Sequence, residues 1–211
     1  MIERVLNQIP GRVHVHLEVG ALGAAAFSPE VTGPDDFRSY RYLLTRPVVP
    51  DSADDPQAPA RTPGAAVAFV MLNPSTATAD KDDPTIAKCR RFARQWGFEH
   101  LLIANAYAWR STDPKAMLRA AARGEDIIGA LNDRMISAVA ACAEMVVCAW
   151  GANITHDRAA RVHGLIPAPR RRALRLTKGR QPYHPLYLPE SLRPGLWEFG
   201  GSICHPEVES R

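Results

Sequence analysis

The chain has 211 residues and a formal net charge of +4, and 46% of its residues are hydrophobic. This length and composition allow one substantial core, and no apolar run is long enough to cross a membrane. The four cysteines form no CxxC pair, which argues against a zinc site. The first residues lack the basic-then-apolar order of a signal peptide. We therefore expect a globular cytoplasmic protein with no metal, no other cofactor and no membrane partner.

Strand-like segments open the chain. Residues 12–20 alternate apolar and polar side chains, which predicts a half-buried strand with Leu17 and Val19 on its inner face. Residues 21–28 and 39–46 are the next strand candidates. Their order along the chain predicts a small antiparallel β meander.

The composition then divides the chain into three parts. Residues 1–46 form the meander, which we expect to pack on the main domain. Residues 47–64 contain five prolines and little apolar content, which predicts a surface loop. Residues 65–211 form an α/β/α domain, because their pattern changes to apolar runs that alternate with helical periodicity.

Four continuous apolar runs in this domain predict strands that are buried on both faces. In chain order they are AAVAFVML, HLLIANAY, EMVVCAW and RALRLT. Helices are expected between them, and Asp-Pro pairs at Asp83 and Asp113 mark two helix starts. A third helix is expected over residues 125–142. The alternation predicts a three-layer α/β/α sandwich around a mainly parallel four-stranded sheet.

Polar side chains follow the carboxyl ends of these strands, where parallel sheets bind their ligands. Asn73 follows the first strand, Asn105 the second, and His184 comes after the fourth. Pro74 holds Asn73 in an extended or turn conformation, so that its side chain is presented at a fixed angle. We expect these three side chains to meet in one cleft.

Residues 158–180 contain eight basic residues and no acidic one. A stretch of this density suits an anionic partner such as nucleic acid, and it suits a solvated basic face equally well.

The motif order is more specific. MLNPSTA, DDPT, NAYAWRSTDP, VVCAWG and LTKGRQPYHPLYLP together resemble the bacterial family catalogued as Domain of Unknown Function 1643, over about residues 27–189. More distantly, the Asn-Pro, Asn and His-Pro positions are similar to motifs of the uracil-DNA glycosylase superfamily, which are α/β/α sandwiches with a four-stranded parallel sheet. Met71 stands where that superfamily usually has Gly, and Leu186-Tyr187 stand where it often has Ser-Pro.

The distant resemblance implies cleavage of the N-glycosidic bond of a base in DNA or RNA. Asn73 would orient the attacking water, and His184 would donate a hydrogen bond to the leaving base. Asn105 would read the base through its donor and its acceptor. The remaining expected substrate contacts are Ser75 and Tyr107 in the pocket and Lys178 and Arg180 on phosphates.

Two other functions fit the same residues. The first is a hydrolase or binding protein for a nucleobase-containing small molecule, such as a nucleotide or modified nucleoside. The second is a non-catalytic nucleic-acid-binding module. Each site residue also has a structural alternative: Asn73 in an Asx turn, Asn105 at a strand end, and His184 in a surface loop.

Overall fold

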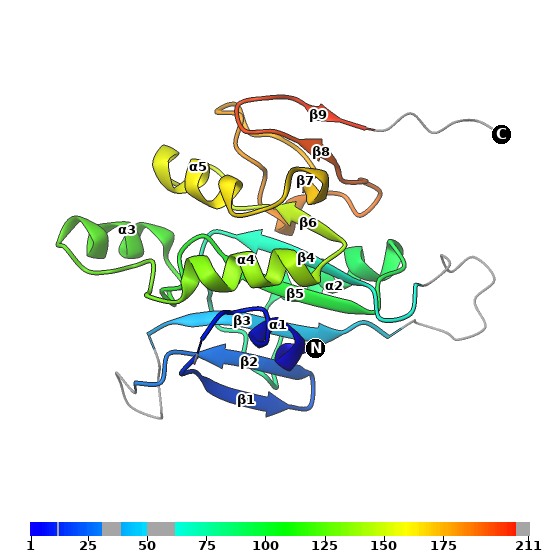
Figure 1. The fold of residues 1–211 in the computed structure, drawn as a ribbon. Coiled ribbons are helices and arrows are strands. Elements are labelled where there is room, and N and C mark those ends of the chain that lie inside the picture. Colours follow the sequence, from blue (N-terminus) through cyan, green and yellow to red (C-terminus); the bar gives the residue numbers. More distant parts are fainter. Residues whose placement is uncertain (12, 31–38, 50–61, 206–211) are drawn as a thin grey trace.

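One sheet runs through the molecule. The computed structural model describes residues 1–11, 13–30, 39–49 and 62–205, and within them the strands follow the order β1-β2-β3-β5-β4-β6-β7-β8-β9. β1 and β9 lie at the two ends of the sheet (Figure 1). In chain order the strands are β1 (His16–Gly20), β2 (Gly23–Phe27), β3 (Arg41–Pro47), β4 (Ala66–Met71), β5 (His100–Asn105), β6 (Met145–Cys148), β7 (Arg171–Ala173), β8 (Gly195–Trp197) and β9 (Ile203–Cys204).

Four neighbouring strands, β5, β4, β6 and β7, are parallel to one another. Antiparallel strands extend this block on both sides, with β3 paired to β5 and β8 paired to β7. The expected α/β class is therefore confirmed. The described sheet is larger than the expected four-stranded one, because the N-terminal meander (β1-β2-β3) and the C-terminal β8 and β9 join it and bring it to nine strands. The added strands cover both edges of the parallel block, which would otherwise leave backbone groups unpaired.

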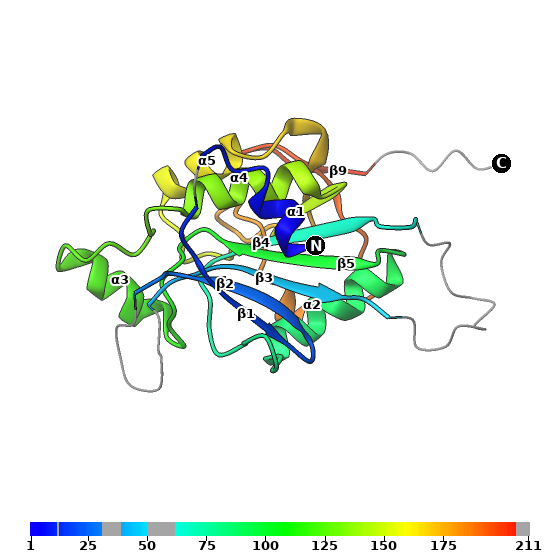
Figure 2. The same ribbon diagram turned by 60° about the horizontal axis from the view of Figure 1, so that its bottom comes forward.

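Helices cover both faces of the sheet. α1, α4 and α5 lie on one face and α2 lies on the other (Figure 2). A hydrophobic core fills each of the two interfaces. No described helix is long and apolar enough to cross a membrane. The helices are α1 (Ile2–Leu6), α2 (Pro84–Gln95), α3 (Pro114–Ala122), α4 (Asn132–Cys142) and α5 (His156–Gly164).

The start of α2 follows the sequence signal. The Asp83 carboxylate accepts hydrogen bonds of 2.9 Å from the backbone N–H groups of Thr85 and Ile86, which the first turn of a helix leaves unpaired. On the buried face, the Phe92 ring stacks on Trp96 with 5.1 Å between the ring centroids. Trp96 in turn stacks on Phe69 of β4, with 5.9 Å between the ring centroids, so that packing on the sheet fixes α2. The N-terminus of α2 lies at the carboxyl end of β4.

The predicted inner face of β1 is its outer face. Val19 is 81% exposed, whereas Gly20 faces a loop so closely that an added Cβ would lie 2.1 Å from Asp80 Oδ1. The same carboxylate accepts a hydrogen bond of 2.7 Å from the backbone N–H of Ala21. Alternation identifies the two faces of a strand, but the loop that covers one face is distant in sequence.

Two helix predictions also change. α4 begins at Asn132 instead of residue 125, because the Asp126 carboxylate accepts from the backbone N–H groups of Ile128 and Gly129 and closes a turn. Gly129 has φ +85°, a left-handed backbone conformation, so the helix can begin only after it. The start of the basic stretch forms α5, for which the sequence pattern predicts no helix.

Candidate functional site

A cavity of about 190 Å³ lies at the carboxyl end of β4, where α2 and α3 begin. Both helices therefore direct their N-termini toward it, and α3 lies past the carboxyl ends of the parallel strands in Figure 1. We call this space the β4 cavity. It is lined by Arg41, Met71, Asn73, Ser75, Asp83, Thr85, Ile86, Ser111, Thr112, Pro114 and His184.

Asn73 is held by its amide nitrogen. Nδ2 donates to the backbone oxygens of Pro74 at 3.0 Å and Ser111 at 2.8 Å. No described group donates to the side-chain oxygen Oδ1. The amide orientation is thus fixed by two carbonyls, and an acceptor is left for a ligand or a water. Ser75 lines the same cavity two residues later.

His184 enters the cavity from a loop before the short 3₁₀ helix η2 (Pro185–Tyr187). Its Nδ1 accepts a hydrogen bond of 3.5 Å from the backbone N–H of Leu186, which places the proton of the neutral ring on Nε2. Burial lowers the pKa of His184, and the carboxylate of Asp83 opposes this fall. The ring is therefore neutral at pH 7 and can act as a hydrogen-bond donor.

Asn105 lies beside the cavity without lining it. Its residue is 1% exposed, and neither Nδ2 nor Oδ1 has a hydrogen-bond partner among the described residues. It is in register with Met71 on β4, and β3, which carries Arg41, is the neighbour of β5 on the other side. Two lining residues thus lie on the strands that flank Asn105. A buried amide without partners is costly, so this position calls for an explanation.

Three other expected contacts lie elsewhere. Tyr107 points to the other side of the sheet, where its hydroxyl lies 3.2 Å from Thr155 Oγ1 and lines a different hollow. Lys178 and Arg180 are exposed residues between the bridged residues Leu176 and Pro182. The Nε of Arg180 donates to the backbone oxygen of Gly200 at 2.9 Å. The sequence placed these residues near strand ends but did not indicate which way they point.

Sequence reasoning missed several cavity residues, and Arg41 is the most unusual of them. It is 2% exposed although it carries a charged side chain. Burial lowers the pKa of Arg41 to about 9, and the carboxylate of Asp83 opposes the fall, so the side chain is cationic at neutral pH. An arginine between two tyrosines of the predicted strand over residues 39–46 was the available signal. The other missed polar residues of the cavity lie at the start of α2 and just before α3; they are Asp83, Thr85, Ser111 and Thr112.

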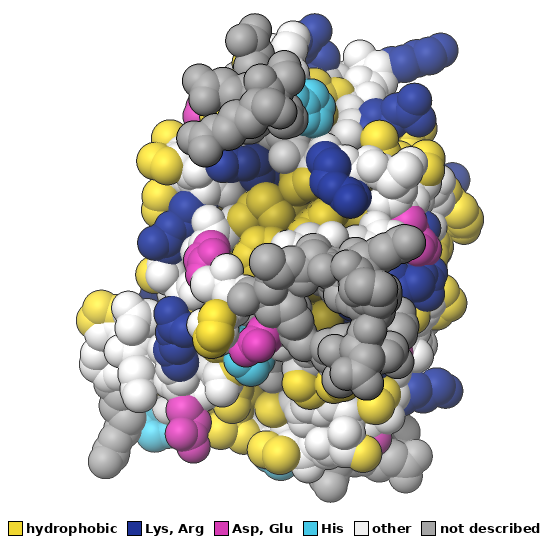
Figure 3. Space-filling view, turned by 90° about the vertical axis from the view of Figure 1, so that its right-hand side faces the viewer, with side chains coloured by type: hydrophobic (Ala, Val, Ile, Leu, Met, Phe, Trp, Pro, Cys, Tyr) yellow, Lys and Arg dark blue, Asp and Glu magenta, His cyan; other side chains and the backbone are white. Residues whose placement is uncertain are grey.

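Much of the basic stretch is engaged within the fold. Arg158, which is 6% exposed, donates from Nη1 to Asp133 Oδ1 at 2.6 Å. Arg161 binds the other carboxylate oxygen of Asp133 at 2.7 Å, and Arg170 donates to backbone oxygens at the end of α4. On the face that Figure 3 shows, the right-hand side of Figure 1, Lys and Arg side chains are scattered among hydrophobic and acidic ones. Arg158, Arg161 and Arg170 therefore stabilise the fold.

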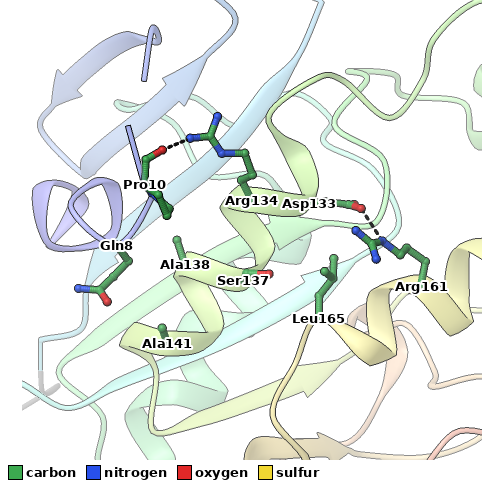
Figure 4. Close-up of a pocket in the computed structure, with 9 residues that line it drawn as sticks. All are labelled: Gln8, Pro10, Asp133, Arg134, Ser137, Ala138, Ala141, Arg161 and Leu165. Atoms are coloured by element: carbon green, nitrogen blue, oxygen red, sulfur yellow. Dashed lines mark hydrogen bonds and ion pairs between the residues drawn. The ribbon is translucent and has the colours of Figure 1, made fainter. Parts of the chain in front are cut away.

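A second hollow, of about 390 Å³, lies between the N-terminal segment, α4 and α5 (Figure 4). Its arginines are already bound: Arg134 donates to the backbone oxygen of Pro10, and Arg161 pairs with Asp133. In the described part of the chain, no three His, Cys, Asp or Glu side chains gather in a way that could hold a metal ion. The β4 cavity, in contrast, is lined by Asn73, to whose Oδ1 no described group donates, and by the neutral ring of His184.

Comparison with known proteins gives one match. A family model described as Protein of unknown function (DUF1643) matches residues 41–186. This range includes every residue that lines the β4 cavity, from Arg41 to His184. No curated protein and no solved structure matches the chain.

Proposed function

Because the chain belongs to the DUF1643 family, which is described as being of unknown function, we propose its function from the site: the β4 cavity binds a nucleobase and cleaves the N-glycosidic bond between base and sugar. One observation supports this proposal most directly. Asn73 and His184, which are 111 positions apart in the chain, line one small cavity. The volume of about 190 Å³ suits a group the size of a single base and is below the usual range for larger ligands.

The proposal includes a fold relationship to the uracil-DNA glycosylase superfamily. That resemblance requires four adjacent parallel strands with helices on both faces. The block β5-β4-β6-β7 and the helices on both faces support it. In this account the antiparallel strands on either side are additions to a glycosylase-like sandwich.

The chemistry follows from the two polar groups. When the bond between the sugar C1′ and the base nitrogen breaks, both bonding electrons go to the base, which becomes negatively charged. The Nε2–H of His184 stabilises a base oxygen on which this charge develops. Asn73 Oδ1 orients a water, whose oxygen bonds to C1′ while its proton passes through solvent to the base. An amide is too weak a base to remove the proton, so Asn73 acts by positioning.

Asn105 would read the base in this account. Its amide offers one donor group and one acceptor, and neither is used by the described residues. Met71, which lines the cavity and is in register with Asn105, would have to move for the base to reach that amide. Methionine is flexible enough to allow such a movement.

A small nucleoside or nucleotide is the second candidate substrate. The engagement of Arg158, Arg161 and Arg170 within the fold favours it, because a nucleic-acid strand needs several free cations along its backbone. Among the exposed basic residues that remain, Lys178 and Arg180 would hold phosphates if the substrate is a polymer.

The test is release of free base. Oligonucleotides with uracil or another altered base, single- or double-stranded, and free nucleosides would each be incubated with the protein, and the free base measured by mass spectrometry. We expect release from at least one class and a loss of about 10²-fold in Asn73→Ala. Asn153→Ala is the matched control, because Asn153 is exposed and lies outside the cavity. Salt-dependent DNA binding without base release would make the protein a binding module instead.

A further inference from the structure

Arg41 carries a buried charge that the fold leaves largely unpaired. Its Nη1 donates to the backbone oxygen of Ala77, whereas Nε is buried without a hydrogen-bond partner and Nη2 makes no hydrogen bond to the described residues. No described carboxylate lies within ion-pair distance of the guanidinium. Buried charges normally have partners, because loss of hydration costs several kcal/mol per ion unless other bonds replace it.

The surroundings of Arg41 also favour an anion. Arg41 lines the β4 cavity, toward which α2 and α3 direct their N-termini. A helix N-terminus carries partial positive charge. Asp83 is the acidic residue of the cavity, and one of its oxygens is already bound to two backbone N–H groups at the start of α2. The neutral ring of His184 adds a further donor. Donors therefore converge on a space of limited size.

We propose that the ligand of the β4 cavity carries an anionic oxygen and that Arg41 binds it. This inference rests on the proposed function for the identity of the site, and it adds the charge of the ligand and a binding residue from β3. The anionic oxygen has two chemical sources. It belongs either to the base, on which negative charge develops as the glycosidic bond breaks, or to a phosphate group of the substrate.

This assignment explains why an antiparallel strand belongs to the site. Arg41 begins β3, and its backbone N–H donates to the oxygen of Ala108 in the segment after β5, which fixes the start of the strand beside the carboxyl edge of the parallel block. The guanidinium fork can bind an oxyanion through two N–H groups at once. Nε and Nη2 are the pair of donors that remain.

The experiment measures binding of three probes by calorimetry: inorganic phosphate, barbiturate as an anionic pyrimidine, and uracil as its neutral analogue. We expect at least one of the two anions to bind the wild-type protein more tightly than uracil does. That anion should bind at least tenfold more weakly to Arg41→Met than to the wild-type protein, and its affinity for Arg41→Lys should lie between the two. Preference for barbiturate assigns the charge to the base, and preference for phosphate assigns it to a phosphate group.

Arg175→Met is the matched control, since it removes the same charge from an exposed residue outside the cavity and should leave binding unchanged. If Arg41→Met does not fold, Arg41→Lys and the shift of the Arg41 Nε–H NMR signal on anion addition provide the same test. The inference is overturned if neither anion binds, or if anions bind equally well without Arg41. Binding of an anion without base release would retain this inference and remove the glycosidase proposal.

Discussion

Two arginines of β3 are buried at opposite ends of the strand, and their surroundings differ. Arg46 is 1% exposed; its Nε pairs with Asp82 Oδ1 at 2.7 Å, and its other two nitrogens donate to backbone oxygens. Arg41 is 2% exposed and donates one hydrogen bond. Arg46 thus stabilises the fold at one end of the strand. Arg41 lies at the carboxyl edge of the parallel block, beside the cavity, and keeps donors that no described group uses. Burial alone does not distinguish a structural arginine from a binding one, whereas its hydrogen-bond partners do.

The largest effect is expected for Arg46→Met. The substitution leaves the carboxylate of Asp82 with one fewer cation and leaves backbone oxygens of the loop after β4 without donors. We expect the free energy of unfolding to fall by about 3–5 kcal/mol, as for other broken buried ion pairs. Urea denaturation measures it. Arg90→Met removes the second, more exposed partner of Asp82 and should cost less. Equal losses in the two variants would contradict the structural role of Arg46.

Arg41→Met should have a smaller effect of the opposite sign. It removes a buried charge with one hydrogen bond and replaces it with an apolar side chain of similar length. The free energy of unfolding should stay the same or rise, by up to about 2 kcal/mol, because desolvation of the charge no longer opposes folding. The same urea series measures it. A loss of about 3 kcal/mol or more would mean that Arg41 stabilises the fold as Arg46 does.

The contrast also explains what the sequence could predict. The Asp-Pro helix starts and the buried runs are local signals, so α2, α3 and the parallel strands were expected. Asn73 and His184 were expected at one site because parallel strands bring their carboxyl ends to the same edge. Arg41 was not, because nothing near it in the chain shows that β3 pairs with β5 or that its side chain lines the cavity at the start of α2.

The two buried asparagines at this edge make the same point. Asn132 Nδ2 donates to the backbone oxygens of Asn105 and Ala106 at 3.1 and 3.0 Å, so that its side chain ties α4 to the end of β5. Asn105 has no such partner for its own side chain. The sequence does not distinguish the two residues. The difference lies in whether segments distant in the chain supply hydrogen-bond partners to the amide, which decides whether it stabilises the fold or can bind a ligand.

The smallest expected effect is a pH dependence that comes from His184. A histidine whose pKa is lower in the folded state binds fewer protons there than in the unfolded state. The free energy of unfolding therefore falls as the pH drops below 6.5, the pKa of His184 in the unfolded state. The loss ends below the folded pKa. His184→Gln should remove the contribution of His184 and leave that of His163, whose pKa is also lowered by burial. The Cε1–H NMR signal of His184 should titrate below pH 6.5. Asp83→Asn keeps a helix cap but removes the opposing carboxylate, and should lower this pKa further. Titration above pH 7 would mean that the ring is charged at neutral pH, where we propose a neutral hydrogen-bond donor.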